Sequence, residues 1–306
     1  MTNRISVVIR ALNEAEHLPA LYVGLAAQTR LADQVILVDS GSVDDSVAIS
    51  ESAGAEIVRI VPEDFSFGRA LNVGCDHSDG DVLVFVSAHV YPTDEQWLER
   101  LVAPFEDHQE VALVYGRQVG DEERTAFSEM EIMRRWFPDR SDHDQDHPFC
   151  NNANCAVRRS VWEHLRYDEE LTGLEDLDWA RRALAGGHRL WYESDATILH
   201  IHEEELAKTV NRYRREAIAH KRVFGHQRMW AVEALGLFTA NVARDYLAAV
   251  PRRKLIRNLT RIPRFRWAQF YGSWKGFRED GHPTALLKRR FYYPKGFTPR
   301  SERQSG

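Results

Sequence analysis

The sequence predicts an α/β protein with a doubly wound, mostly parallel sheet, followed by a helical and basic C-terminal extension. Through residues 1–225, short β-branched runs alternate with segments whose apolar residues recur at helical spacing, which is typical of parallel sheets with right-handed crossovers. The charge then changes sign. Residues 1–225 hold 23 Lys and Arg against 41 Asp and Glu, whereas residues 226–306 hold 17 against 5. We therefore expect two domains, 1–225 and 226–306.

Two strand–loop–helix units open the chain. Ile5–Ile9 is a β-branched run, and a polar loop separates it from a helical pattern of Leu18, Leu21, Tyr22 and Leu25. The second strand is Gln34–Val38. A Gly/Ser/Asp turn that begins at Asp39 leads from it to a helix over Ser46–Ser52, which opens on capping residues.

The remaining elements continue the alternation. Asp81–Val86 is a near-continuous apolar run, as expected for a strand buried on both faces. The acidic, His-rich stretch Asp139–His147 predicts a mobile loop. The other predicted elements are strands at Ala55–Ile60, Val111–Tyr115 and Leu190–His202, a helix carrying Arg69–Cys75 and a helix from Ser160.

Composition excludes several protein classes. With 306 residues, 43% hydrophobic and 28% charged, the chain can bury a core and is neither collagen-like nor disordered. Its three cysteines are too few for a disulfide framework, so we expect reduced thiols and a cytoplasmic protein. No apolar run approaches the ~18 residues of a membrane span, and Met1–Ile9 lacks the pattern of a signal peptide.

The strand ends carry the polar residues. In parallel α/β sheets, ligands bind beyond the carboxyl ends of the strands. Those ends deliver a polar and acidic set: Arg10, Asn13 and Glu14 from the first strand, Asp39 and Ser40 from the second, and Ser87, Ala88 and His89 from the fourth.

Ordered motifs run along the same region: Val7-Val-Ile-Arg-Ala-Leu-Asn-Glu, Ile36-Leu-Val-Asp-Ser-Gly-Ser-Val-Asp-Asp-Ser, Phe67-Gly-Arg-Ala-Leu-Asn-Val-Gly, Gly80-Asp-Val-Leu-Val-Phe-Val-Ser-Ala-His, Tyr115-Gly-Arg-Gln, Asn154-Cys-Ala-Val, Leu174-Glu-Asp-Leu-Asp-Trp and His200-Ile-His. Over residues 4–222 their order resembles family 2 glycosyltransferases of the nucleotide-sugar-binding GT-A fold, and rhamnosyltransferase-like members most. The resemblance implies transfer of a sugar from a nucleotide diphosphate to an acceptor hydroxyl, with inversion, in polysaccharide or lipid-linked glycan synthesis.

The resemblance also implies catalytic roles for two acids. Asp176 matches the aspartate that acts as general base in this family, and Glu175 would orient the acceptor or tune that base. A structural interpretation stays open, because Glu175, Asp176 and Asp178 would also favourably charge the first turn of a helix.

Further residues match the family's donor site. Asp39 is placed to bind the pyrimidine of the nucleotide; Ala11, Glu14 and Ser40 would lie beside it, and Asp44 would shape the pocket or serve as an ordinary helix cap. The other candidates each carry an open alternative. Arg69 and Asn72 share a helical face, although Arg69 could be a surface arginine; Asn154, with Asn151 and Asn152, could bind sugar hydroxyls or form a turn.

One motif departs from the family pattern. Most members carry an acidic Asp-x-Asp element that holds Mg²⁺ or Mn²⁺ on the diphosphate, whereas this chain has Ser87-Ala88-His89. His89 and His202 are then the candidate metal ligands. Protonated His89 or Arg69 could instead offset the leaving-group charge without metal, and His200 is interpreted as a core histidine.

The C-terminal extension interleaves aromatic residues with arginines at helical spacing, which favours an interfacial helix on an anionic inner-leaflet surface. Packing on the catalytic domain, or a homodimer, would use the same residues. We expect no nucleic-acid partner, because the acidic body would repel a duplex. Two other functions stay open, a sugar nucleotidyltransferase and a non-catalytic nucleotide-sugar-binding protein.

Overall fold

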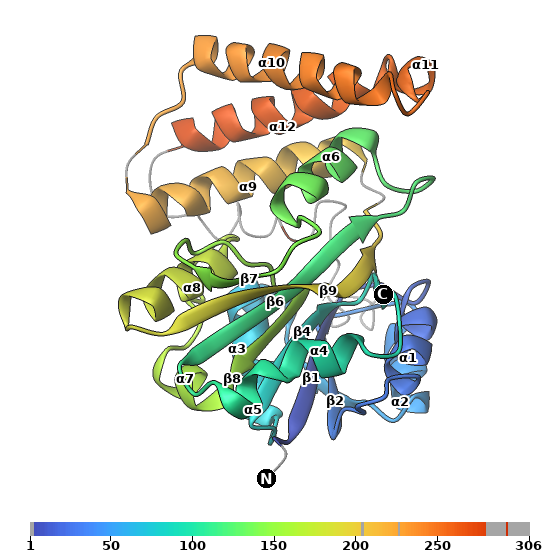
Figure 1. Ribbon diagram of the computed structural model, residues 1–306, viewed down its shortest axis with the longest axis vertical. Helices are drawn as coiled ribbons and strands as arrows, with labels where there is room; N and C mark the ends of the chain where they lie inside the picture. The colour runs from blue at the N-terminus through green and yellow to red at the C-terminus, as the bar shows by residue number, and fades with distance from the viewer. Residues whose placement is uncertain (1–2, 203–204, 226, 280–291, 293–306) are drawn as a thin grey trace, which may run out of the picture. The chain divides into compact units, whose positions relative to one another are not determined.

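The computed structural model describes residues 3–202, 205–225, 227–279 and 292. It divides into two compact units, residues 1–203 and 204–306. The first is an α/β unit built on one sheet, and the described part of the second is helical (Figure 1).

The sheet of the first unit has the strand order β3-β2-β1-β4-β8-β6-β9-β5, with β7 paired to β9. Its strands are β1 Ile5–Ala11, β2 Gln34–Asp39, β3 Glu56–Arg59, β4 Val82–Ser87, β5 Val90–Pro92, β6 Val111–Gly120, β7 Asp142–Gln145, β8 Asn154–Arg158 and β9 Arg189–His200.

The predicted parallel sheet is confirmed for β3, β2, β1 and β4, which are all parallel to one another. The other half is mixed, because β8 runs antiparallel to both β4 and β6, while β9 is parallel to β6. In the parallel half the register places Ala11 opposite Asp39 and Arg10 opposite Ser87. The predicted ligand-binding strand ends therefore lie side by side at one edge of the sheet.

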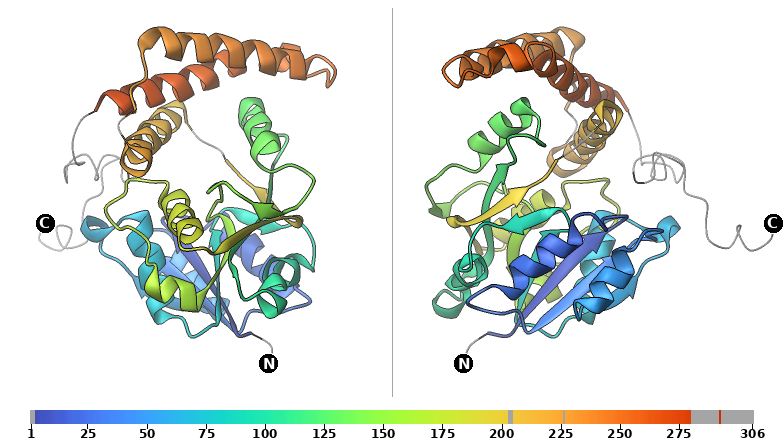
Figure 2. Two further views of the ribbon diagram at one scale, coloured as in Figure 1. Left: turned by 60° about the vertical axis from the view of Figure 1, so that its left-hand side comes forward. Right: turned by 90° about the vertical axis from the view of Figure 1, so that its right-hand side faces the viewer.

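Helices cover both faces of this sheet, as the turned views in Figure 2 show. One hydrophobic core joins the sheet to α3, α7 and α8, and the other joins it to α1, α4 and α5. All three cysteines are free and buried, as expected. The helices of the unit are α1 Leu18–Ala26, α2 Ser46–Ser52, α3 Phe67–His77, α4 Trp97–Val102, α5 Pro104–Asp107, α6 Phe127–Trp136, α7 Arg159–His164 and α8 Glu175–Ala185, with a 3-10 turn at Pro62–Asp64.

The prediction of a mobile loop at Asp139–His147 is wrong. Residues 142–145 form β7, which pairs antiparallel with β9. The cause is Gln145, which is buried and makes three hydrogen bonds. Its amide nitrogen donates to the carbonyls of His147 and Phe149 at 2.6 and 2.7 Å, and its oxygen accepts from the Tyr115 hydroxyl at 2.9 Å. These bonds fix a segment whose composition is typical of a loop.

The second unit contains α9 Leu206–Phe224, α10 Ala231–Ala249, α11 Leu255–Asn258 and α12 Arg261–Arg278. Its first helix lies before the predicted boundary at residue 225, because α9 packs along α12. Two glycines allow the close approach: a Cβ on Gly272 would lie 2.5 Å from the Val210 carbonyl oxygen, and one on Gly276 would lie 2.3 Å from that of Arg214. The division therefore falls at 203/204.

A buried ion pair joins α10 to α12. The Arg266 guanidinium donates to both carboxylate oxygens of Asp245, at 2.7 and 2.8 Å, and both side chains are at most 2% exposed. None of the helices in the described ranges is long and apolar enough to span a membrane. The predicted extension beyond residue 279, apart from Tyr292, lies outside the described residues.

Candidate active site

The turn after β2 is organised by Asp39, which is 3% exposed. Its carboxylate accepts hydrogen bonds from the backbone N–H groups of Gly41, at 3.2 Å, and Ser42, at 3.1 Å. The Ser40 hydroxyl donates to the Ala11 carbonyl at 3.2 Å, which ties the turn to the end of β1. The predicted donor-site residues Ala11, Asp39 and Ser40 are thus brought together.

Asp44 fastens this turn to the loop after β1. Its carboxylate accepts from the backbone N–H groups of Ala15, at 3.1 Å, and of Ser46, at 3.0 Å. Burial opposes ionisation, but the Ser46 hydroxyl and these N–H groups hold the pKa of Asp44 below its ordinary value. Asp44 therefore binds the first residue of α2 although the cap position itself is Asp45, and the Ser46 hydroxyl accepts from the Glu14 backbone N–H at 2.8 Å.

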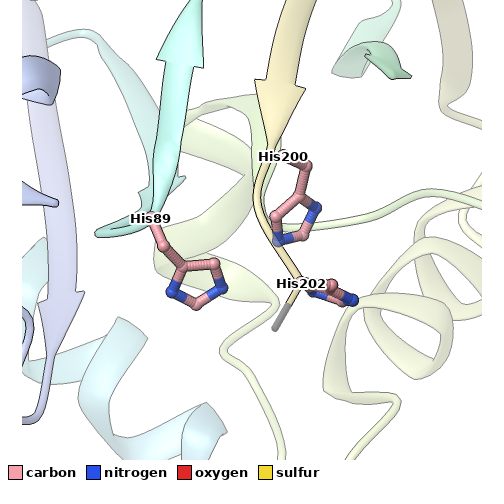
Figure 3. Close-up of side chains that lie close together, drawn as sticks. All are labelled: His89, His200 and His202. Atoms are coloured by element: carbon pink, nitrogen blue, oxygen red, sulfur yellow. The ribbon is translucent and has the colours of Figure 1, made fainter. Parts of the chain in front are cut away.

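Three histidines gather beyond the ends of β4 and β9. His89 follows β4, and His200 and His202 lie at the end of β9 (Figure 3). One nitrogen of each ring lies within 4.8 Å of the others. The predicted ligands His89 and His202 therefore come together, and His200, which we expected to be a core histidine, is 5% exposed and belongs to the same cluster.

Each histidine has a side-chain oxygen beside its Nδ1. Glu14 lies 3.1 Å from Nδ1 of His89. Gln118 lies 2.7 Å from that of His200, and Glu129 lies 2.8 Å from that of His202. Imidazoles held in this way are oriented for a metal ion, because the second nitrogen is directed by the bond that the first one makes. The cluster can hold a divalent cation.

The acids of the first turn of α8 have different partners. Glu175 is 5% exposed and accepts from the Arg10 guanidinium at 3.1 Å. Asp178 accepts from Arg181 and Arg182 within the helix, at 3.0 and 2.7 Å. No ion pair within the described ranges involves Asp176. The backbone before it is unusual, since Leu174 has a φ of 55°, a conformation that costs energy outside glycine.

Asp176 is the carboxylate whose ionisation the surroundings disfavour. Burial, together with the charge of Glu175, raises the pKa of Asp176 from 3.8 to about 7. Hydrogen bonds from the backbone N–H groups of Leu177, at 2.8 Å, and Asn152, at 3.3 Å, act in the opposite direction, as does the charge of Arg10. A carboxylate with a pKa near neutrality suits a general base.

A hydrogen-bonded path connects Asp176 with the histidines. The backbone N–H of Asn152 donates to Asp176, and the adjacent Asn151 accepts from the Gln118 amide at 3.0 Å. The oxygen of the same Gln118 amide faces His200. The candidate base and the candidate metal site therefore share one supporting segment.

Two predicted ligand-binding residues of α3 have partners within the chain. Arg69 is 44% exposed and lies 3.4 Å from Glu169 and 3.9 Å from Asp64. Asn72 is 2% exposed. Its amide nitrogen donates to the Tyr167 carbonyl and to Glu169, and its oxygen accepts from Trp162 and from the Tyr167 backbone. It holds the 165–169 segment against α3.

Asn154, a second amide that was predicted to bind ligand, also has a structural role. It is fully buried; its oxygen accepts from the Trp97 indole at 2.9 Å, and its nitrogen donates to the carbonyls of Arg117 and Ala196 at 3.0 and 2.8 Å. Its hydrogen-bonding groups therefore join β6, β8, β9 and α4 in the core. Binding of a sugar would require these bonds to break.

The sequence interpretation gave no role to Gln118, Glu129 or Arg10, although all three orient site residues. Gln118 lies in the quoted Tyr115-Gly-Arg-Gln motif, but no pattern linked it to a histidine. His200 carried a usable signal, because residues two apart on a strand point to the same side. Glu129 lies on α6 and carried no local signal at all.

Comparison with known proteins identifies the family. The model of glycosyl transferase family 2 matches residues 6–166, which is more than half of the chain. The chain belongs to glycosyl transferase family 2. It is a transferase, and the GT-A fold expected from its motifs is confirmed by solved structures with that fold.

Two curated relatives of this family 2 transferase come from Salmonella. It is 27% identical to the O-antigen chain rhamnosyltransferase RfbN of Salmonella typhimurium over 225 residues, which cover 69% of this chain and 70% of the relative. It is 28% identical to the O-antigen chain rhamnosyltransferase WbaN of Salmonella anatum over 196 residues, covering 61% and 62%. The expected likeness to rhamnosyltransferases is thus confirmed.

Two solved structures share the fold at low identity. The mannosyltransferase PcManGT of Pyrobaculum calidifontis, in complex with GDP-Man and Mn²⁺, has a TM-score of 0.60 at 16% identity and covers 97% of this chain and 89% of its own. The glucosyl-3-phosphoglycerate synthase of Mycobacterium tuberculosis, in complex with Mn²⁺, UDP and glucosyl-3-phosphoglycerate, has a TM-score of 0.54 at 18% identity, covering 74% and 81%.

Proposed function

We propose that this family 2 transferase moves a glycosyl group from a nucleotide diphosphate to an acceptor hydroxyl with inversion, and that Asp176 is the general base. One observation carries the proposal: Asp176 lies next to an ion-paired carboxylate, and burial raises its pKa to about 7. Of the acids in its helical turn, it is the one whose environment suits a proton acceptor at neutral pH.

The proposed transfer is a single displacement at the anomeric carbon. The acceptor oxygen forms a bond to the anomeric carbon, the bond from that carbon to the diphosphate oxygen breaks, and the hydroxyl proton passes to Asp176. Glu175, which pairs with Arg10, tunes the base through its charge. A divalent cation at His89, His200 and His202, when bound, would offset the charge of the departing diphosphate.

The sugar is a rhamnosyl group in this proposal, and the acceptor is a growing polysaccharide or lipid-linked glycan. The support is the likeness to two proteins named O-antigen chain rhamnosyltransferases. The test is calorimetric titration with dTDP-rhamnose, UDP-sugars and GDP-sugars, followed by NMR of the product. We expect one donor to bind and the product to have the opposite anomeric configuration. Retention of configuration, or binding of no nucleotide sugar, would contradict the proposal.

The sequence leaves two other functions open. Membership of the family does not favour a sugar nucleotidyltransferase. A non-catalytic nucleotide-sugar-binding protein would bind the donor and yet show no transfer with any acceptor, so turnover in the same donor panel separates it from the enzyme.

We also infer that the helical unit associates with an anionic membrane surface, which would place a lipid-linked acceptor nearby at the cytoplasmic face. Within α10 only Asp245 and Ala249 are buried. The exposed charges Glu233 and Arg244 lie beside one face on which uncharged exposed positions recur at spacings of three and four residues: Val232, Gly236, Thr239, Ala240, Ala243, Leu247 and, just beyond the helix, Val250. A helix that is apolar on its outer face as well as its inner one requires an apolar neighbour.

The charges at the end of this helix favour lipid as that neighbour. Exposed Leu247, Val250, Ile256 and Leu259 lie in the same 244–264 segment as seven Lys and Arg, whereas its single acid, Asp245, is buried on Arg266. Apolar side chains that insert beside cations are typical of interfacial helices on anionic bilayers. A second copy of this chain would bring like charges together, so the predicted homodimer stays a less favoured prediction.

Co-sedimentation with vesicles tests this inference. We expect binding to phosphatidylglycerol vesicles that weakens with salt, and weaker binding to phosphatidylcholine vesicles. Leu247→Glu should reduce it at least several-fold, whereas Val23→Glu, at a residue of α1 that is 71% exposed, should not. The inference fails if the protein stays in the supernatant at low salt, or if Leu247→Glu instead converts a dimer to a monomer in light scattering.

A further inference from the structure

We propose that His89, His200 and His202 form an all-nitrogen site for a borderline transition metal such as Co²⁺ or Zn²⁺, and that this site does not hold Mg²⁺ in the absence of substrate. The described side chains of the cluster are imidazoles only. Imidazole nitrogen binds Co²⁺ and Zn²⁺ well, whereas Mg²⁺ prefers oxygen ligands and retains its waters. The role of the metal at the diphosphate rests on the proposed function, but the ligand set does not.

The tautomer of His200 follows from a chain of donors and acceptors. The backbone N–H of Ala153 can only donate, so the Asn151 atom that it meets at 2.9 Å is the oxygen. The Gln118 atom 3.0 Å from that same oxygen must therefore be the amide nitrogen. The Gln118 oxygen then faces His200, which must carry its proton on Nδ1.

The same tautomer holds for the other two histidines. Nδ1 of His89 meets a carboxylate oxygen of Glu14, and Nδ1 of His202 meets one of Glu129. A carboxylate oxygen accepts, so both imidazoles carry a proton on Nδ1. In a neutral imidazole the lone pair is then on Nε2. All three histidines therefore present Nε2 as the nitrogen that can ligate a metal.

The backbone also fixes where the ligands stand. Val90, which follows His89, pairs with His200 in the antiparallel β5–β9 ladder. The Ile201 backbone N–H donates to the His89 carbonyl at 3.1 Å, so the residue between the other two histidines is tied to the first. Bonds of about 2.1 Å allow ligand nitrogens to lie up to about 4.2 Å apart. One ligand nitrogen of each ring already lies within 4.8 Å of the others, which is close to that range.

The carboxylates of Glu14 and Glu129 lie in the second layer, and this arrangement has a chemical consequence. Charged oxygens that bond to Nδ1–H raise the basicity of Nε2 and hold each ring in place. A family site of carboxylates binds metal through charge and suits Mg²⁺, whereas three neutral imidazoles offer little charge and select by ligand type. The replacement of the acidic element by Ser87-Ala88-His89 thus changes the class of metal.

Titration of the metal-free, full-length protein with Co²⁺ alone tests the proposal. We expect one Co²⁺ per chain, with visible absorption bands that shift on binding and disappear when Zn²⁺ is added, and no calorimetric heat with Mg²⁺ at the same concentrations. His200→Gln should weaken Co²⁺ binding by at least about tenfold. Glu129→Gln, which removes only the second-layer charge, should weaken it by about 10–100-fold.

His108→Ala is the matched control, because His108 is also bonded to a glutamate, Glu110 at 3.3 Å, but lies outside the cluster. It should bind Co²⁺ as the wild type does. Circular dichroism checks that each variant folds, and if His200→Gln does not fold, Glu129→Gln decides. Unchanged Co²⁺ affinity in the folded cluster variants, or Mg²⁺ binding as tight as that of Co²⁺, would overturn the proposal.

This test is separate from that of the proposed function, since no nucleotide or acceptor is present. Asp176→Asn should bind Co²⁺ normally even where transfer is lost. Active protein that binds no Co²⁺ would refute the metal proposal alone, and protein that binds Co²⁺ but transfers no sugar would refute the function alone.

Discussion

The acids in the first turn of α8 differ in their properties because each has different partners. Asp178 is paired with two arginines of its own helix, and Glu175 with Arg10 from β1. Within the described part of the chain, Asp176 accepts hydrogen bonds from backbone N–H groups, and burial and the charge of Glu175 raise its pKa. Spacing along the helix could not distinguish these acids, because the decisive partner of Glu175 comes from a strand 165 residues away.

The pH dependence of transfer should report these charges. If Asp176 is the base, kcat/KM rises with pH and levels off above about 7, because the base must be deprotonated. Glu175→Gln removes a charge that raises the pKa of Asp176. The rise of kcat/KM with pH should therefore occur at lower pH in this variant than in the wild type. Arg10→Met removes a charge that lowers the pKa of Asp176, so the rise of kcat/KM should occur at higher pH in this variant. A pH profile that is unchanged in both variants would contradict the assignment of Asp176 as the base.

Asp176→Asn should make the protein more stable at high pH. A carboxyl whose pKa is raised on folding from 3.8 to about 7 destabilises the folded protein as pH rises between these values, since the folded state favours the proton. The amide carries no such penalty. We expect a Tm about 2 °C or more above the wild type at pH 8 and a difference near zero at pH 4; an equal difference at both pH values would argue against the raised pKa.

Local motifs identified some of the site residues and misassigned others. The strand-end residues Glu14 and His89 do meet in the folded protein. Asn72 was predicted to bind ligand because it shares a helical face with Arg69, and Asn154 because amides recognise sugars, but both are buried and hydrogen-bonded within the chain. An amide in a motif can bind a substrate or satisfy buried backbone, and only its tertiary partners decide between these.

At the scale of elements, Asn154 joins strands that are far apart in the sequence. Asn154→Ala would leave the Trp97 indole N–H and two backbone carbonyls unpaired in the core. Each buried unsatisfied group costs about 1–3 kcal/mol, so we expect the free energy of unfolding to fall by about 3 kcal/mol or more. Denaturant unfolding checks this, with the exposed Ser52→Ala as a control that should change stability little.

The α9–α12 contact depends on glycine in a similar way. A Cβ at Gly276 would clash with the Arg214 carbonyl at 2.3 Å, whereas one at Gly236, on α10, would meet nothing within 4 Å. Gly276→Ala should therefore destabilise the helical unit and accelerate its proteolysis. Gly236→Ala should be neutral or stabilising by about 0.5–1 kcal/mol, because alanine favours the helix. Equal protease sensitivity of the two variants would contradict this packing.

Periodicity predicted the strands β1, β2, β3, β4, β6 and β9 and the helices α1, α2 and α3. It missed β8 and α4, although both are buried, and it missed β5 and β7, which are short and have few apolar residues; β7 is held by the buried amide of Gln145. It also placed α9 with the preceding domain, because the change of charge begins after that helix while its packing partner, α12, comes 37 residues beyond its end. Contacts between distant segments are not encoded in local periodicity.

At the scale of the whole molecule, charge and chemistry are divided between the units. The acidic part of the chain carries the sheet edge with its candidate base and histidine cluster, and the basic part carries the apolar outer face of α10. A net charge of −6 conceals this division. We propose that one unit performs the transfer and the other brings it to an anionic surface.

The central claim is that Asp176 takes the proton of the acceptor. Its most direct test is the transfer rate of Asp176→Asn with saturating donor, alongside Asp178→Asn, which changes an acid of the same turn that is already paired with arginines. We predict a loss of about 10²–10⁴-fold for Asp176→Asn with donor affinity unchanged, and near wild-type transfer for Asp178→Asn. Wild-type transfer by folded Asp176→Asn would contradict the account.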